Sequence, residues 1–365
     1  MEAMKSAARS RLRRLARALG AASVRAVLLT DPFDVRYLSG FTGEDSWLLI
    51  GRGGGVLLTD SRYGEQAEAE CPGFRVVERR KSLVEALAPE VRRLRLARLA
   101  FDPERVTVAL RGRLSKALKG VRLVELPHAV GDLRLRKDAS EVRAIGRAIR
   151  IAEAAFAAFR RRIRPGMTEE RLAAELDHAL RLAGSEGSPF PTICAVDASA
   201  SRPHARPGGR RLGKRGLLLV DFGARAGGYA SDLTRCLFAG KIPPHIARAY
   251  EVVLAAQEAG IRRAGPRVPL VEVDAAARAV IAAAGLGPKF AHGTGHGLGL
   301  EVHEPPALGP RAKEGTLEPG MVVTIEPGVY LRGEFGIRIE DDVLVTGRGR
   351  RVLSGLPKTL EAMVL

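Results

Sequence analysis

The segment HGTGHGLGLEVHE, residues 292–304, places three histidines among four glycines. Glycine disfavours helix, so we expect a loop that brings imidazoles to a site. His296 lies between Gly295 and Gly297, where the backbone can approach a metal ion without a Cβ atom in the way. Imidazole nitrogen suits Mn, Co, Fe or Zn better than Ca or Mg. The HExxH motif of zinc proteases is absent, since Gly-Thr-Gly follows His292.

A first candidate pair of carboxylates lies in LLLVDFGARAGGYASDLTR. Asp221 ends an apolar run that is typical of a buried strand, and Asp232 follows a turn-rich stretch. A hairpin centred between Ala226 and Gly227 would place these acids opposite each other, about 5 Å apart on one face. Two carboxylates that close repel unless one is protonated or a cation lies between them. Either aspartate alone could instead cap a strand or pair with an arginine.

A second candidate pair has the same arrangement near the C-terminus, in VVTIEPGVYLRGEFGIRIEDD. Glu326 and Glu340 are symmetric about Gly333, so a hairpin turning there would oppose them, although Pro327–Gly328 could distort the register. Arg338 shares a strand face with Glu340 and could orient a carboxylate. Four acids on inward faces require compensating positive charge. The two hairpins and the histidine segment therefore indicate a divalent metal site.

The elements before these motifs alternate between extended and helical patterns. Strands are expected at 26–30, 46–50, 55–60, 74–78 and 98–102, with helices at 61–70, 82–95 and 110–119. This alternation predicts an α/β N-terminal domain. The pattern changes near Arg136, where we place the boundary between domains 1–136 and 137–365.

The second domain is predicted to mix helices and strands without a βαβ rhythm. Helices are expected at 140–163, 168–183, 244–264 and 271–284, with Asp138 and Glu141 at the start of the first. The strands are the two hairpins described above. No G-x-G-x-x-G follows a strand and no Walker loop occurs, so a nucleotide cofactor has no support.

Composition narrows the class of protein. The net charge of +18 invites a nucleic-acid partner, but 49 arginines against 10 lysines and the absence of like-charge blocks favour a compositional habit. We expect neither a nucleic-acid nor a membrane partner. Cys71, Cys194 and Cys236 form no disulfide framework, which suits a reducing, cytoplasmic location. The Arg-rich N-terminus resembles a transit peptide in composition, but Leu12, Leu15 and Leu19 favour an amphipathic helix.

The ordered set of Asp221, Asp232, His296, Glu326 and Glu340 resembles the ligands of the pita-bread metallopeptidases, which include methionine aminopeptidases, prolidases and Xaa-Pro aminopeptidases. The segments GYASDLTR, HGTGHGLGLEVHE and IEPGVY…IRIEDDVLVT carry this resemblance. The segments DVRYLSGFTGEDSWLLI and LLTDSRYGEQAEAE are similar to the creatinase-like N-terminal domain of Xaa-Pro aminopeptidases and prolidases. The resemblance implies an α/β N-terminal domain followed by a mixed α+β pita-bread catalytic domain.

The resemblance also implies a dinuclear site, with manganese the expected metal and cobalt or zinc as alternatives. Asp232 and Glu340 would bridge the ions, and a bridging hydroxide would attack the substrate. Glu326 would accept a proton while remaining a ligand. Thr234 and Arg338 are candidates to hold the ligand carboxylates.

Three further histidines receive roles from the same resemblance. His303 would steady the carbonyl under attack, and His292 would contact the substrate near its proline. His204, in ASRPHARP, matches more loosely a histidine that lines the proline pocket.

The expected function is an Xaa-Pro aminopeptidase, which removes an N-terminal residue from a peptide with proline in second position. A prolidase restricted to Xaa-Pro dipeptides is the alternative. A creatinase-type amidinohydrolase or a non-catalytic binding protein on the same fold is a further one. The family resemblance also implies a homodimer.

Overall fold

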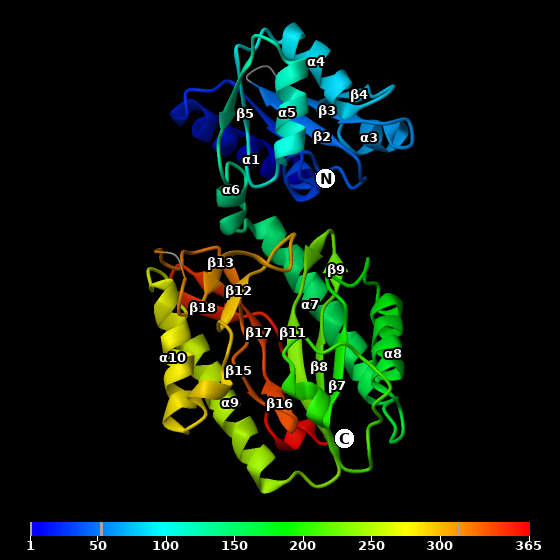
Figure 1. Ribbon diagram of the computed structural model, residues 1–365, viewed down its shortest axis with the longest axis vertical. Coiled ribbons are helices and arrows are strands. Elements are labelled where there is room, and N and C mark those ends of the chain that lie inside the picture. Colours follow the sequence, from blue (N-terminus) through cyan, green and yellow to red (C-terminus); the bar gives the residue numbers. More distant parts are fainter. Residues whose placement is uncertain (1, 52–53, 313) are drawn as a thin grey trace. The chain divides into compact units, whose positions relative to one another are not determined.

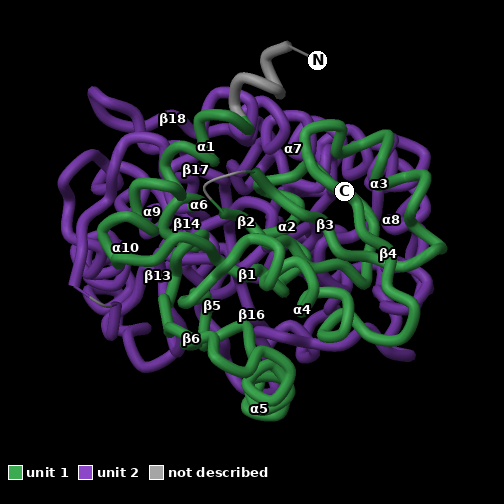
Figure 2. The backbone as a smooth tube through the Cα atoms, turned by 90° about the horizontal axis from the view of Figure 1, so that it is seen from above, with its two compact units in different colours: residues 1–134 green, residues 135–365 purple. Residues whose placement is uncertain are grey.

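The computed structural model describes residues 2–51, 54–312 and 314–365 (Figure 1). Two compact units divide the chain, one ending at Arg134 and the other running from Leu135 to Leu365 (Figure 2). No helix among the described residues combines the length and apolar character needed to cross a bilayer.

The first unit is built on a six-stranded mixed sheet in the order β4-β3-β2-β1-β5-β6. Its strands are β1 (Ala26–Leu29), β2 (Trp47–Gly51), β3 (Gly54–Thr59), β4 (Phe74–Glu78), β5 (Arg98–Phe101) and β6 (Arg122–Glu125). Its helices are α1 (Glu2–Ala21), α2 (Pro32–Ser39), α3 (Gly64–Glu70), α4 (Leu83–Arg93) and α5 (Val108–Ala117), and α6 (Gly131–Leu135) leads to the second unit. The predicted α/β class is confirmed for this unit. The predicted amphipathic helix is α1, which buries Leu15 and Leu19.

The second unit places its strands between two pairs of helices (Figure 1). Its helices are α7 (Ala139–Arg160), α8 (Glu169–Leu182), α9 (Pro244–Arg263) and α10 (Leu270–Ala283). One sheet has the order β11-β8-β7, from β7 (Ile193–Val196), β8 (Gly216–Phe222) and β11 (Leu233–Ala239). The predicted mixed α+β class is confirmed here.

A second sheet in this unit has the order β13-β12-β14-β17-β18. Its strands are β12 (Gly295–Gly297), β13 (Glu304–Leu308), β14 (Val322–Ile325), β17 (Asp341–Thr346) and β18 (Gly349–Val352). Two short hairpins complete the unit, namely β9 (Arg225–Ala226) with β10 (Tyr229–Ala230) and β15 (Gly328–Leu331) with β16 (Phe335–Arg338).

The helices of this unit begin and end where local chemistry dictates. Asp138 caps α7 by accepting from the amides of Ser140 and Glu141, and the Glu141 carboxylate accepts in return from the Asp138 amide. This reciprocal capping box explains the predicted acidic helix start.

Apolar side chains of α7, α8 and α9 pack on β7, β8 and β11 to form the main core. The core holds rigid the strand ends from which the candidate site is built.

Candidate metal centre

The first hairpin brings Asp221 and Asp232 to one end of the β8–β11 pair. Their predicted register is wrong, because Asp221 pairs with Thr234 and Asp232 lies one residue before β11. The tight turn is Gly227–Gly228, where both glycines have positive φ, a combination that two-residue hairpins require and glycine provides. The shift amounts to two residues, so Asp232 keeps the sheet face that alternation predicts. The two acids are therefore diagonal neighbours.

The second hairpin has the predicted register. Gly328 pairs with Arg338 in β15–β16, and Ile325 pairs with Asp341 in β14–β17. Both pairings share the symmetry about Gly333, so Pro327–Gly328 does not displace the register between them. Glu326 and Glu340 occupy the interval between these two ladders, at the point where the chain passes from one sheet to the other.

The histidine segment is not all loop, because Gly295–Gly297 forms the short strand β12 between β13 and β14. Atoms of neighbouring strands crowd the backbone there. A Cβ atom at Gly295 would overlap the Thr324 carbonyl oxygen, and one at Gly297 would overlap the Pro305 carbonyl oxygen. The glycines on either side of His296 thus allow neighbouring strands to approach closely. The sequence alone predicts instead that these glycines let the backbone approach a metal ion. The His296 amide donates to Thr324 Oγ1 at 3.1 Å, which fixes the residue in place.

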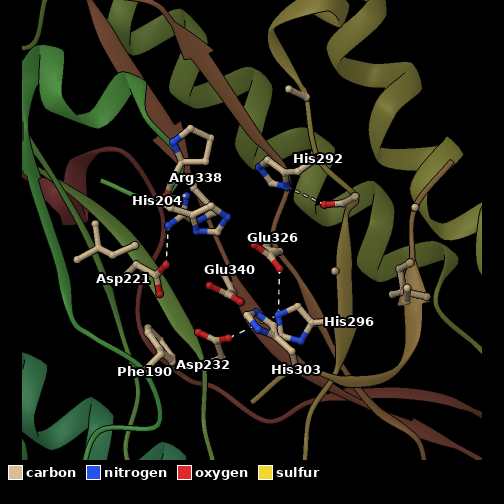
Figure 3. A pocket seen from close by; sticks show the side chains of 18 of the residues that line it. Phe190, His204, Asp221, Asp232, His292, His296, His303, Glu326, Arg338 and Glu340 are labelled. Carbon is tan, nitrogen blue, oxygen red and sulfur yellow. Dashed lines mark hydrogen bonds and ion pairs between the residues drawn. The ribbon is translucent and has the colours of Figure 1, made fainter. Parts of the chain in front are cut away.

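These three elements converge on one cluster of ligand atoms (Figure 3). His296 Nε2 lies 3.3 Å from Glu326 Oε1 and 3.6 Å from Asp232 Oδ2. Potential ligand atoms of His296, Glu326 and Glu340 lie within 4.8 Å of one another, and so do those of Asp221, Asp232 and Glu340. Glu340 belongs to both groups, so its carboxylate lies between them. The structure thus brings together all five residues that the resemblance implies as ligands.

The electrostatics of the cluster show a deficit of positive charge. Burial raises the pKa of Asp232 and of Glu340 well above the ordinary range, and repulsion from neighbouring carboxylates raises both further. Burial also raises the pKa of Asp221, although Arg338 opposes the rise. Burial acts in the same direction on Glu326, but its hydrogen bond and charge interaction with His296 outweigh burial and lower its pKa to about 2. Three of the four acids are therefore held in a setting that favours a proton or a cation.

The donor set of the cluster fits divalent metal. Asp221 Oδ1 and Glu340 Oε1 are buried and have no hydrogen-bond partner among the described residues. Buried carboxylate oxygens are ordinarily satisfied, and bound ions are a common explanation of exceptions. Four carboxylates with one imidazole match the preference of Mn, Co, Fe or Zn. These five residues together could hold divalent metal.

Arg338 ties the two hairpins together beneath the cluster. Its guanidinium donates to Asp221 Oδ2 at 2.5 Å, to Thr234 Oγ1 at 3.1 Å and to Tyr330 Oη at 2.8 Å. Thr234 in turn donates to Glu340 Oε2 at 2.6 Å. Thr234 and Arg338, the two candidates for holding ligand carboxylates, thus contact Glu340 and Asp221 directly.

A second buried arginine, which sequence reasoning missed, clamps the main chain at the same place. Arg235 donates to the carbonyl oxygens of Thr234 and Glu340 at 2.9 and 2.6 Å, and to Asp341 Oδ1 at 2.7 Å. The side chains of Arg235 and Asp341 are 0% and 2% exposed. An arginine within the apolar strand DLTRCLF and the doublet Asp341–Asp342 were the signals available in the sequence.

His292 lies in the same cavity but has both ring nitrogens engaged by the protein. Nε2 contacts Tyr330 Oη at 2.9 Å, and Nδ1 contacts the Gly293 carbonyl oxygen at 2.8 Å. The Gly293 carbonyl oxygen can only accept, so Nδ1 donates to it, and Nε2 of the neutral ring accepts a hydrogen bond from the Tyr330 hydroxyl, which itself accepts from Arg338. Nδ1 then carries the ring proton. Tyr330 was also missed, although alternation from Glu326 places it on the same strand face.

His303 and His204 line the cavity and are exposed in it. The His303 ring meets the His296 ring edge to face, with centroids 4.1 Å apart. Burial and the neighbouring charge of His296 lower the pKa of His303, which favours the neutral form of its ring. His204 lies on the side of the cavity that holds Asp221 and Arg338 (Figure 3). The cavity itself has a volume of about 780 Å³ and is lined by the whole cluster.

Metal binding by this cluster is expected to release protons and to weaken as the pH falls. Asp232 and Glu340 have raised pKa values in the metal-free protein, and Glu326 raises the pKa of His296 against the effect of burial. A metal must displace the protons these groups hold, so affinity rises with pH by about tenfold per unit for each proton displaced. Isothermal titration calorimetry of the chelator-treated protein with Mn²⁺, repeated at several pH values between about 6 and 8, measures how the affinity depends on pH. A pH-independent affinity contradicts the prediction.

Comparison with known proteins agrees with this geometry. A model described as metallopeptidase family M24 matches residues 143–347, and a creatinase/prolidase N-terminal domain model matches residues 11–136. The chain therefore belongs to metallopeptidase family M24. Its fold is a creatinase-type N-terminal domain followed by a pita-bread catalytic domain, as the sequence resemblance implied. The family uses divalent metals.

Particular relatives extend over almost the whole chain. A solved Xaa-Pro dipeptidase from Bacillus anthracis is 34% identical, with a TM-score of 0.93, and the match covers 98% of this chain and 100% of the other. A solved X-Pro aminopeptidase from Thermotoga maritima is 35% identical, with a TM-score of 0.91 and coverage of 97% and 99%. An Xaa-Pro dipeptidase of Pyrococcus furiosus is 30% identical, covering 96% of this chain and 99% of the relative.

Proposed function

We propose that this protein is a dinuclear-metal exopeptidase that hydrolyses the bond between an N-terminal residue and a following proline. The observation that carries the proposal is the convergence of Asp221, Asp232, His296, Glu326 and Glu340 at the wall of one cavity. The names of the relatives support the proline-directed activity.

The roles of the residues follow from their surroundings. When bound, two divalent ions would activate a water molecule and polarise the scissile carbonyl. Glu326 is held ionised beside His296, so it can accept a proton from that water. The lowered pKa of His303 favours a neutral ring, and the side chain faces the cavity, so its ring N–H can donate to the carbonyl oxygen under attack. His204 and His292 line the same cavity, and we propose that they contact the substrate near its proline.

Within this activity we favour the Xaa-Pro dipeptidase over the aminopeptidase that the sequence analysis expected. Two of the three relatives described above are named as Xaa-Pro dipeptidases. A dipeptide also presents a carboxylate directly after its proline, and Arg206 and Arg311 line the cavity with exposed side chains. Guanidinium is well suited to bind carboxylate. The aminopeptidase remains the second candidate because the Thermotoga maritima neighbour carries that name.

The experiment that separates the two is hydrolysis of Xaa-Pro dipeptides beside matched Xaa-Pro-Xaa tripeptides by the manganese-loaded protein, followed by mass spectrometry. Cleavage of the dipeptides alone supports the dipeptidase, and release of the first residue from the tripeptides supports the aminopeptidase. Peptides with glycine in place of proline are the matched control. Cleavage of neither proline substrate by metal-loaded protein would exclude both, leaving an amidinohydrolase or a binding protein.

Removing the charges of Arg206 and Arg311, the two exposed arginines that line the cavity, is expected to weaken dipeptide binding. Charge-assisted hydrogen bonds to a carboxylate contribute about 1.5–3 kcal/mol each before solvent screening. We therefore expect Arg206→Ala with Arg311→Ala to raise KM for an Xaa-Pro dipeptide about tenfold and to leave kcat nearly unchanged. KM for the amidated dipeptide, which lacks the carboxylate, should not move. Arg348→Ala, an exposed arginine outside the cavity, is the control. Equal effects on both substrates would contradict carboxylate recognition.

The remaining details belong to the same proposal. We propose manganese as the working metal, with cobalt or zinc as alternatives, since the donor set suits all three. We also propose a cytoplasmic homodimer. The three cysteines are free and buried, which is compatible with a reducing compartment. Light scattering at micromolar concentration tests the dimer, which a monomeric mass would contradict.

A further inference from the structure

A buried ion pair joins the start of the second unit to the segment that carries His303. Lys137 Nζ lies 2.9 Å from Glu304 Oε1, and the two side chains are 1% and 4% exposed. Lys137 is held from two other directions, because its amide donates to the Gly320 carbonyl oxygen at 2.8 Å and its ammonium to that of Leu135 at 3.3 Å. The lysine is therefore fixed in the protein independently of its contact with Glu304.

Glu304 organises the turn between β12 and β13. It is the first residue of β13 and pairs with Gly297, next to His296, where the ladder register is irregular. Its second oxygen, Oε2, accepts from the Glu301 amide at 3.4 Å. Its carboxylate also fills the space beside Gly299, which a Cβ atom would occupy. The Glu304 carboxylate therefore contacts the turn at two points, beside Gly299 and at the Glu301 amide.

The contacts of Glu304 also affect His303, which immediately precedes it in the chain. Its side chain is exposed to the cavity, and its ring rests against the edge of His296. One possible ligand group combines His303 with Asp232 and His296, with atoms within 4.8 Å (Figure 3). An exposed imidazole keeps such a position only if its backbone is held. Hydrogen bonds from Ala230 and Arg225 hold the first part of the turn, at Gly299 and Leu300, and Glu304 holds the part nearest His303.

We propose that Lys137 and Glu304 form a positioning pair that fixes the position of His303 beside the cluster of ligand atoms. Two full charges in a buried site are a poor source of stability compared with apolar side chains of similar volume. They do impose one geometry, since the ammonium requires the carboxylate at a fixed distance. The catalytic consequence rests on the proposed function, because His303 is there the group that touches the substrate carbonyl.

The test compares Lys137→Met with Arg136→Ala in the full-length, manganese-loaded protein. Methionine keeps the length and apolar stem of lysine without its charge. Arg136 is the adjacent residue and pairs with Glu318 at the surface, so it is a matched control. We expect K137M to lower kcat for an Xaa-Pro dipeptide roughly tenfold or more, since small misplacements of a reacting group have effects up to about a hundredfold. We expect R136A to stay within about twofold.

Two further measurements separate positioning from simple stability. The bound manganese per chain should be unchanged in K137M. The NMR resonance of the His303 ring is measured in the metal-free protein and assigned by its loss in His303→Asn. Its chemical shift should change in K137M and stay the same in R136A. The double variant K137M/E304Q removes both charges while keeping an acceptor for the Glu301 amide. It should regain thermal stability without regaining kcat.

A His303 resonance that stays in place in K137M overturns the proposal, as does a kcat that falls only in proportion to lost manganese. A double variant that regains kcat together with stability also overturns it. If K137M does not fold, Glu304→Gln is assessed in the same way. If the wild-type protein cleaves neither proline substrate, the proposed function fails, whereas the resonance still decides whether the pair positions His303.

Discussion

Replacing Glu340 by glutamine is expected to reduce kcat by at least about a hundredfold and to release one or both metal ions. Glu340 belongs to two of the three ligand groups of the cluster, and its Oε1 is buried without a partner among the described residues. Glutamine has nearly the same shape and can still accept from Thr234, which donates to Oε2 at 2.6 Å. The loss is therefore one of charge and metal affinity, and stabilisation by a metal ion contributes several kcal/mol to such reactions.

The matched control lies on the same hairpin. Glu334 is exposed at the turn between β15 and β16, and Glu334→Gln should keep both metal content and kcat. Metal content measured by plasma mass spectrometry after dialysis, together with kcat on an Xaa-Pro dipeptide, tests both variants. Full activity of E340Q with two bound ions per chain would contradict the role of Glu340.

Replacing Arg235 by methionine is expected to give the largest loss of stability. The guanidinium is fully buried and donates to carbonyl oxygens of Thr234, Glu340, Leu356 and Pro357 as well as to Asp341. Breaking a buried ion pair costs about 3–5 kcal/mol. Lys358 still pairs with Asp341 after the change, so here the cost arises mainly from the four buried carbonyl oxygens that lose their donor. For a unit of this size we expect a fall in Tm of roughly 10 °C. The manganese affinity should fall too, since the clamp holds the main chain of Glu340.

Differential scanning calorimetry of the metal-free and metal-loaded proteins measures both effects. Arg262→Ala breaks an exposed ion pair with Glu258 and should change the free energy of unfolding by at most about 0.5 kcal/mol. Asp341→Asn keeps the shape of the clamp and should give a smaller loss than R235M. An R235M variant as stable as R262A would show that the clamp does not hold the hairpins.

The sequence predicted the site better than it predicted the connections that support it. Carboxylates and histidines stand out because their chemistry is unusual on apolar strands, and alternation along a strand assigns them to a face. The exact partner across a ladder depends on where the turn falls. Symmetry about Gly333 gave the right register for Glu326 and Glu340, whereas the turn at Gly227–Gly228 displaced that of Asp221 by two residues.

Residues that act across long sequence separations escaped prediction. Arg235 contacts Asp341, and Lys137 contacts Glu304, in each case through elements whose packing only the folded chain defines. β7 was also missed, because its four residues closely follow the turn-rich stretch GSEGSPFP, which indicates a loop. The positions of the helices were easier to predict, since amphipathic periodicity and caps such as Asp138 act over neighbouring residues.

The proposed function requires two bound metal ions for cleavage before proline. The decisive measurement is a titration of the chelator-treated protein with Mn²⁺, in which bound metal and hydrolysis of an Xaa-Pro dipeptide and its tripeptide counterpart are followed together. We predict that hydrolysis of a proline substrate appears with added metal and reaches its plateau when two ions are bound per chain. A protein that binds two ions and cleaves neither substrate, or one that cleaves equally well without metal, would contradict the account.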